Sequence, residues 1–449
     1  MIERMFDSVT VVGAGLAGCE AAWQLARRGV RVRLVEMRPL VMTPAHHTSR
    51  AAELVCTNSF KSDVPEVAAG LLKEEMRRLG SLVLSAADAT RVPSGQDLSV
   101  DRERFADRVE AGLLEAGVER VAGELTAVDT EQPTIVATGP LTSDALARDL
   151  QRLTGASNLH FYDAAAPIVF AESLDQGELF RASRYGKGAG NYLNAPLDRV
   201  RYGQLVTDLV AAEQVVLHDF ERTMWFEGCI PIEEMARRGP ETLRYGPLKP
   251  IGLDDPSTGR WAHAIVQLRQ EDAAAGLYNL VGFQTNLSWP AQRRVFRTIP
   301  GLGHAEFARL GVMHRNTFIR SPDLLHPTHL LRGSARTWLA GQLVGVEGYL
   351  ESAMSGLVAG LNVAASLAGS PEIVFPDDTA IGSLVRYITT PQKLFAPMNA
   401  TWGLFPPLPV IQGGPRLGKR ERAAAHLARA RASFNAYVDP RDWLTAPPA

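Results

Sequence analysis

Two of the three cysteines in this chain lie in segments whose composition suits chemistry at a thiol. Cys56 stands within the polar stretch 53–63, among hydroxyls, an amide and a lysine. Neighbours of this kind can lower the pKa of a thiol from its usual value of about 8.5. Cys229 follows a glycine and precedes Pro231 by two positions, in a constrained loop where a thiol facing a cleft is placed for nucleophilic attack. A buried inert thiol is the alternative at each position, and the residues leave both open.

The third cysteine indicates packing rather than chemistry. Cys19 falls in the first turn of a helix that follows a glycine-rich turn, where a small residue usually fills space. Three cysteines in a chain of 449 residues give no disulfide framework, and their spacing matches no metal-ligand pattern, so we expect no metal site. Cys56 and Cys229 also lack a C-x-x-C arrangement, which disfavours a dithiol relay unless the fold brings them together. We therefore expect a reducing, cytoplasmic setting.

A glycine-rich turn near the N-terminus predicts a dinucleotide site. A short strand at 8–12 leads into the turn, a helical pattern at 19–28 follows, and a second strand at 30–35 ends at Glu36. The first glycine makes the tight turn, the second lets backbone N–H groups approach a pyrophosphate, and the third allows close packing of helix on strand. Glu36 would accept from both ribose hydroxyls and repel a 2′-phosphate, which argues against NADP here. The predicted cofactor-binding residues of the turn are Gly13, Ala14, Gly15, Leu16, Ala17 and Gly18.

Two later segments favour FAD over NAD as the bound dinucleotide. A strand at 134–138 ends at Gly139, as return strands do in flavoproteins with two dinucleotide sites. Another strand, at 336–340, leads into a second glycine-rich turn and then a helix that runs to about residue 368. The N-terminus of that helix would lie by a flavin and stabilise its reduced anion. An ordinary turn is the alternative for this segment taken alone. Its predicted cofactor-binding residues are Gly341, Gln342, Gly345 and Val346.

The order of these segments predicts an α/β protein with a split cofactor domain. We expect a Rossmann-like FAD-binding domain of the glutathione-reductase type in residues 1–150 and 326–449, which ends in a C-terminal helix at 419–437. Residues 151–325 would form an inserted mixed α/β domain for substrate or RNA, with strands at 166–171, 262–268 and 278–282. No apolar run approaches the roughly 18 residues of a membrane span, and the charged N-terminus argues against a secretory signal.

Seven blocks of sequence, spread over nearly the whole chain, resemble the bacterial folate- and FAD-dependent tRNA uracil-5-methyltransferases. The match is specific because it extends beyond the glycine turn that many flavoproteins share, and it includes both polar-loop cysteines. The blocks occupy residues 56–62, 226–231, 244–250, 281–287, 311–317, 341–349 and 397–400.

The resemblance implies an enzyme that forms 5-methyluridine at position 54 of the tRNA T-loop. In this family methylenetetrahydrofolate supplies the one-carbon unit, reduced FAD carries or reduces it, and NADH or NADPH is the reductant. Cys229 would add as a thiolate to carbon 6 of uracil, which makes carbon 5 nucleophilic. Cys56 would lie nearer the flavin, as a base or as a guard of the reactive cofactor. No second full G-x-G-x-x-G is present, so nicotinamide would have no Rossmann unit of its own.

The RNA partner would be met by local basic clusters, because a net charge of −2 gives no general attraction to nucleic acid. Clusters lie at 181–187, 237–249, 293–297 and 416–431, and each can equally be a solvated surface. The one after Cys229 is favoured, since the target base must reach that thiol, with Tyr245 or Phe226 as a platform for the extruded base. The predicted RNA contacts are Arg237, Arg238 and Tyr245. The predicted polar contacts of the folate are Asn58, His314, Arg315 and Asn316, for which helix caps or core hydrogen bonds are an equal alternative.

Three other functions stay open at this point. The same chemistry could act on ribosomal RNA, which the residues do not distinguish from tRNA. A flavin oxidoreductase acting on a small molecule would use the cysteines as a redox relay. A non-catalytic partner protein, like some flavin-binding members of wobble-uridine tRNA modification complexes, would need no thiols in polar loops. We expect no membrane association and no obligate protein partner.

Overall fold

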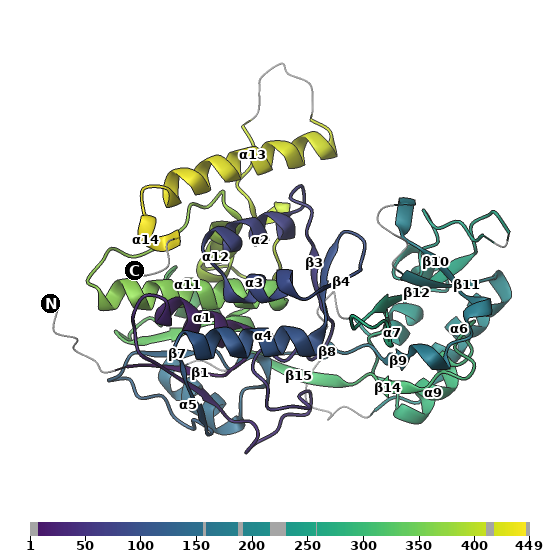
Figure 1. The fold of residues 1–449 in the computed structure, drawn as a ribbon, viewed down its shortest axis with the longest axis horizontal. Coiled ribbons are helices and arrows are strands. Elements are labelled where there is room, and N and C mark those ends of the chain that lie inside the picture. Colours follow the sequence, from purple (N-terminus) through teal and green to yellow (C-terminus); the bar gives the residue numbers. More distant parts are fainter. Residues whose placement is uncertain are drawn as a thin grey trace.

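The protein has two lobes, each built around its own hydrophobic core, joined by a pair of extended strands (Figure 1). The computed structural model describes residues 8–155, 159–186, 192–215, 230–256, 258–409 and 417–445, with the backbone alone at 159–164 and 313–316. The larger lobe contains both the beginning and the end of the described chain, and the smaller lobe lies between them in sequence.

A five-stranded parallel sheet forms the centre of the larger lobe, in the order β16-β7-β1-β2-β6. Central β1 is almost entirely apolar and buried, as expected for a strand covered on both faces. β16 joins the sheet from the last third of the sequence, so segments on both sides of the smaller lobe share one sheet. The strands are β1 (Val9–Val12), β2 (Val32–Glu36), β6 (Glu119–Ala122), β7 (Thr134–Val136) and β16 (Thr337–Leu339).

Helices α1 (Leu16–Ala26) and α11 (Tyr349–Leu367) pack closely on this sheet because α11 presents glycines to α1. A Cβ at Gly356 would lie 2.0 Å from the backbone oxygen of Ala17, which only a glycine avoids. α1 begins three residues earlier than predicted, since Gly15 is its N-cap. Within the described residues α11 alone has the length and composition of a membrane span, but 83% of its apolar window is buried inside the protein.

Further elements cover the sheet of the larger lobe. Glu75 accepts the N–H groups of Ala380 and Ile381 at 2.8 and 2.9 Å, so its carboxyl group, on α2, caps the N-terminus of α12. A small antiparallel sheet, in the order β3-β5-β4, carries the chain that follows Cys56. These elements are β3 (Ser59–Ser62), β4 (Arg91–Val92), β5 (Asp97–Val100), α2 (Ala68–Arg78), α3 (Leu82–Ala89), α4 (Arg102–Glu115), α5 (Asp144–Thr154), α10 (Ser321–Leu324), α12 (Ala380–Thr389), α13 (Lys419–Val438) and α14 (Asp442–Thr445).

The smaller lobe contains a six-stranded antiparallel sheet with helices packed against it, in the order β10-β11-β12-β13-β9-β14. The three strands predicted for this region correspond to β9, β12 and β13, with ends shifted by one or two residues. The elements are β9 (Ile168–Phe170), β10 (Phe180–Ala182), β11 (Tyr192–Leu197), β12 (Ala264–Gln270), β13 (Leu277–Leu280), β14 (Phe307–Arg309), α6 (Arg199–Ala211), α7 (Ile232–Arg237), α8 (Thr242–Tyr245) and α9 (Trp289–Phe296).

Two strands carry the chain between the lobes. β8 (Leu159–Ala164) leads out of the larger lobe, and β15 (Met313–Phe318) returns to it, paired antiparallel along their full length. β8 begins and β15 ends within about ten residues of the predicted domain boundaries at 150/151 and 325/326. The boundaries themselves stay predictions.

Candidate cofactor cleft and active site

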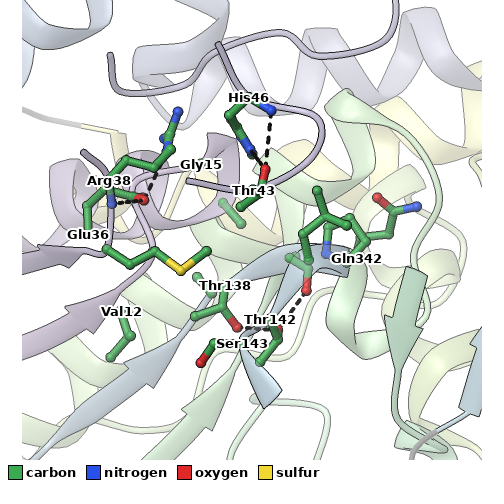
Figure 2. Close-up of a pocket in the computed structure, with 18 of the residues that line it drawn as sticks. Val12, Gly15, Glu36, Arg38, Thr43, His46, Thr138, Thr142, Ser143 and Gln342 are labelled. Atoms are coloured by element: carbon green, nitrogen blue, oxygen red, sulfur yellow. Dashed lines mark hydrogen bonds and ion pairs between the residues drawn. The ribbon is translucent and has the colours of Figure 1, made fainter. Parts of the chain in front are cut away.

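An elongated cleft of about 1010 Å³ opens at the carboxyl ends of the parallel strands (Figure 2). A crevice at this edge of an open α/β sheet is where such folds bind ligands. The cleft walls come from both ends of the sequence, because the β1 and β7 turns face the turn after β16. Eight of the twelve predicted cofactor-binding residues line it, namely Gly13, Gly15, Leu16, Ala17, Glu36, Gly139, Gly341 and Gln342.

In the glycine turn after β1, a side chain would have room at Gly15 but not at Gly18. Gly15 has no heavy atom within 4 Å of where a Cβ would stand, so the cleft approaches its backbone directly. At Gly18 a Cβ would meet the Gly13 oxygen at 1.8 Å, which fixes how closely α1 packs on the turn. Gly13 itself has a φ of +97°, a conformation that other residues rarely adopt. The turn therefore presents the N-terminus of α1 to a ligand.

Glu36 lies at the end of β2, across the cleft from Gln342 (Figure 2). Its Oε2 accepts the Ala14 N–H at 2.7 Å, and its Oε1 accepts the Arg38 backbone N–H and Nε at 3.1 and 2.9 Å. Although burial opposes ionisation, the hydrogen bonds and charge of Arg38 hold the pKa of Glu36 below its usual value. A fixed carboxylate therefore faces the nucleotide end of the cleft.

Four predicted cofactor residues support the cleft without lining it. Ala14 and Gly18 hold the first turn, as described above. A Cβ at Gly345 would lie 2.3 Å from the Phe395 ring, and Val346 is fully buried and bridges to Met398. Several polar lining residues were not predicted, because they come from the loops after β2 and β7 and from α11, for which the turn motif gives no signal. These are Arg38, Thr43, His46, Thr142, Ser143 and Ser352.

The Cys56 loop borders the cleft. Val55 and Tyr349 both line the cleft, and the Tyr349 hydroxyl accepts the Cys56 N–H at 2.7 Å. Cys56 itself is half-buried. Burial and the Cys56 side chain both raise the pKa of Tyr349, so the phenol keeps its proton. This end of the cleft thus combines a cysteine with the N-terminus of α11.

A partly buried ion pair lies beside that helix terminus. Lys61 Nζ lies 2.7 Å from Glu351 Oε1, which also accepts the Ala400 N–H at 3.0 Å. Glu351 is fully buried, and within the described residues its Oε2 has no hydrogen-bond partner. Glu351 is 290 positions away from Lys61 along the chain, so the sequence around Cys56 gives no signal for this pair.

The predicted substrate residues are scattered over both lobes. Asn58 is fully buried and donates to the Val100 and Gln270 oxygens at 2.9 and 3.0 Å, so its amide joins the lobes and does not line the cleft. Tyr245 is 74% exposed on the smaller lobe, with the Arg244 guanidinium 5.7 Å from its ring centroid. Arg237 pairs with Glu234, and Arg238 is exposed. His314, Arg315 and Asn316 lie on β15, of which the backbone alone is described.

Cys229 and Phe226 lie outside the described residues, so the predicted nucleophile is known only by the residues around it. Val215 and Ile232, on either side of the gap, donate to the Asn286 and Gln284 oxygens at 2.9 and 2.7 Å. Glu233 accepts the Asn286 N–H at 2.7 Å. Both described ends therefore attach to the stretch 284–286, which belongs to one of the resembling blocks.

Carboxylates match part of the charge in the basic clusters. Arg431 pairs with Glu74 at 2.7 Å and Arg294 with Glu213 at 2.6 Å. The exposed Lys419, Arg420 and Arg422 begin α13, on the outside of the larger lobe (Figure 1). Lys187 and Arg416 of the predicted clusters lie outside the described residues.

A parallel sheet with this glycine turn, an acid after the second strand and a second turn after β16 defines the class of Rossmann-like dinucleotide-binding flavoprotein folds. Two solved structures of GidA from Aquifex aeolicus have the same fold. The first has a TM-score of 0.66 and 17% sequence identity, and the match covers 97% of this chain and 77% of the GidA chain. The second has a TM-score of 0.65 and 18% identity, and the match covers 87% of this chain and 68% of the GidA chain. The predicted fold class is confirmed.

The sequence comparisons go further than the fold. Residues 8–371 match the model of the family described as Glucose inhibited division protein A. A protein of Geobacter sulfurreducens named methylenetetrahydrofolate–tRNA-(uracil-5-)-methyltransferase TrmFO is 57% identical over 94% of this chain and 98% of its own. A relative of the same name from Heliobacterium modesticaldum is 54% identical over 96% and 98%. The chain therefore belongs to the glucose-inhibited division protein A family and, within it, to the group of these TrmFO methyltransferases.

Proposed function

We propose that this protein is an FAD-dependent enzyme that methylates carbon 5 of a uracil in tRNA, with methylenetetrahydrofolate as the one-carbon donor. The observation that carries the proposal is the continuity of the cofactor cleft with the Cys56 loop through Val55 and Tyr349. The names of relatives that are 54–57% identical over nearly the whole chain supply the substrate class. The proposed product is 5-methyluridine at position 54 of the T-loop.

The residues of the cleft fit FAD. Open space at Gly15 and the N-terminus of α1 suit a pyrophosphate, and the Glu36 carboxylate suits ribose hydroxyls. When bound, FAD would supply the redox chemistry that carries or reduces the one-carbon unit.

The protein's own groups would activate the uracil. Carbon 5 of uracil is a poor nucleophile until a thiolate adds to carbon 6 and forms an enolate. We assign that addition to Cys229, from the block of sequence around it. Cys56, beside the cleft, would act as a base or protect the reactive cofactor, and the N-terminus of α11 would stabilise negative charge there.

NADH or NADPH would supply the electrons. Because FAD would occupy the glycine turn, where Glu36 also disfavours the 2′-phosphate of NADPH, a nicotinamide cofactor would bind elsewhere. The RNA would contact the smaller lobe, where Tyr245 and the guanidinium of Arg244 offer a stacking surface next to positive charge.

The test is product formation from defined components. Purified protein is incubated with an unmodified tRNA transcript, methylenetetrahydrofolate and NAD(P)H, and the digested RNA is examined by mass for 5-methyluridine. We expect product at a single T-loop uridine. Product from S-adenosylmethionine without folate would refute the donor, and product only with ribosomal RNA would change the substrate.

The role of Cys229 has its own test. Wild-type protein should form a covalent adduct with a fluorouracil-containing T-arm RNA, and Cys229→Ser should not. Cys56→Ser is the matched control, because it removes a thiol from the other polar loop. An adduct that persists in Cys229→Ser and disappears in Cys56→Ser would exchange the two roles.

A further inference from the structure

The Cys56 loop lies where the two lobes meet, and an arginine from each lobe binds it. Arg102, at the start of α4 in the larger lobe, donates to the Cys56 oxygen at 3.0 Å and also to the oxygen of Leu54. Arg309, at the end of β14 in the smaller lobe, donates to the oxygens of Val55 and Cys56 at 2.8 and 2.7 Å. One carbonyl thus accepts from two guanidinium groups that approach from different lobes.

Carboxylates balance only part of this positive charge. Glu271, 2% exposed, lies 2.5 Å from Arg102 and 4.0 Å from Arg269. Asp97 also interacts with Arg269, which lowers the pKa of that carboxyl against the larger effect of burial. Within the described part of the chain, no carboxylate oxygen lies within ion-pair distance of Arg309. Three guanidinium groups therefore stand against two carboxylates in a region with little access to water.

Several polar atoms of the cluster are buried without a hydrogen-bond partner in the described residues. Leaving such atoms unsatisfied costs roughly 1–3 kcal/mol each, so the cluster is a poor device for stability alone. The atoms are Asn58 Oδ1, Arg269 Nε, Glu271 Oε1 and Arg309 Nε.

The charges around the Cys56 side chain come from three directions. Arg102 stands on α4, Arg309 on β14, and the Tyr349 phenol on α11. Burial and the neighbouring Arg102 lower the pKa of Arg309, and the Cys56 side chain acts in the opposite direction. A negative charge on the sulfur would therefore stabilise the cluster.

We propose that Arg309, with Arg102 and Glu271, positions the Cys56 loop beside the cleft and favours the thiolate form of Cys56, the anion that this buried cluster lacks. Opposite charges at such separations act strongly when water is excluded. The smaller lobe would thereby control the reactivity of a thiol in the larger lobe. The inference rests on the proposed function in one respect, because it takes Cys56 to be a reactive group.

The experiment follows the alkylation of Cys56 by iodoacetamide over a range of pH, by peptide mass, on the full-length protein with its cofactor. In Arg309→Gln the midpoint of the pH profile should rise by about one unit, so that alkylation near pH 7 is about tenfold slower. Arg309→Lys keeps the charge and should retain most of the wild-type profile. Arg27→Gln is the matched control, because Arg27 is also partly buried and donates to carbonyls at 3.1 and 3.0 Å, far from Cys56 in the larger lobe.

Glu271→Gln supplies a test of opposite sign. Removing this carboxylate leaves more positive charge beside Cys56, so the midpoint should fall. If Arg309→Gln does not fold, Arg309→Lys and Glu271→Gln decide the matter. An unchanged midpoint of Cys56 alkylation in Arg309→Gln would overturn the inference. If that variant does not fold, an unchanged midpoint in Glu271→Gln would do so.

Methyl transfer measured on the same samples separates this inference from the proposed function. Shifted midpoints in the variants, together with a wild-type protein that makes no 5-methyluridine, would support the effect on the thiol and refute the proposed function. Unshifted midpoints in a protein that does make 5-methyluridine would refute the inference alone.

Discussion

The two ends of the cleft are built in different ways. At the nucleotide end, Gly13, Gly15 and Glu36 come from one short stretch of sequence around β1 and β2. At the other end, Cys56 contacts Tyr349 and Arg309, which are 293 and 253 positions away. Spacing along the chain specifies the first end, whereas contacts with segments far away in sequence, one of them in the other lobe, specify the second. Cofactor binding should therefore survive changes that disturb the chemistry at Cys56.

The largest effect should come from the packing glycine of the nucleotide end. In Gly18→Val the new Cβ would meet the Gly13 oxygen at 1.8 Å, so the turn must shift or α1 must move away. We expect a loss of more than about 3 kcal/mol in the free energy of unfolding, together with loss of FAD, as for other overpacked cores. Urea unfolding and the bound-flavin absorbance measure the two effects.

Gly15→Ala is the control that separates folding from binding. No atom lies within 4 Å of the added Cβ, so stability should be unchanged while FAD affinity falls. Equal stability of the two variants would contradict the account of the turn.

An intermediate effect is expected at the junction of the lobes. Asn58→Ala removes donors to Val100 in one lobe and Gln270 in the other, at a fully buried position. Leaving both carbonyls with one partner fewer should cost about 1–3 kcal/mol. Cys56 alkylation should change as well, while FAD affinity should not. A parallel loss of FAD affinity would mean that the two ends of the cleft are not independent.

The sequence specified the nucleotide end well because each of its residues acts through neighbours a few positions away. Gly13 needs its own φ of +97°, and Glu36 accepts from Ala14 and Arg38, all within the first βαβ unit. The predicted strands and helices of the larger lobe match for the same reason.

The junction could not be predicted in this way. Arg309 shows no periodicity or motif that distinguishes it from a surface arginine, and its partners appear only when β14 is placed against the Cys56 loop. Asn58 was predicted as a polar contact of the folate, whereas its amide donates to backbone oxygens of both lobes. For Cys229 the resemblance remains the basis of its predicted role.

A pH-dependent effect should come from the Glu75 carboxyl group, which acts within one lobe. Burial raises the pKa of Glu75 to about 8, against the hydrogen bonds from Ala380 and Ile381. This pKa lies above the pKa of Glu in the unfolded chain, which is about 4.3. The contribution of Glu75 to stability is therefore complete below about pH 4.3 and is lost as the pH rises through about 8. The stability of the wild type relative to Glu75→Gln should therefore fall between pH 5 and pH 9, by at most about 1.4 kcal/mol per pH unit.

Urea unfolding at three pH values across that range measures this difference. FAD affinity serves as the control and should be equal in both proteins. A wild type that becomes more stable relative to Glu75→Gln as the pH rises would mean that Glu75 is ionised in the folded protein and caps α12 as a carboxylate.

The central claim, that cofactor and thiol share one cleft, is tested most directly by protection of Cys56. Alkylation of Cys56 is followed by peptide mass in the FAD-loaded protein and after removal of the flavin. Cys19 is the internal reference, because it is fully buried and burial, with Glu36, raises the pKa of its thiol to about 12. We predict that bound FAD slows alkylation of Cys56 several-fold and leaves Cys19 unreactive. Equal rates at Cys56 with and without bound FAD would contradict a shared cleft.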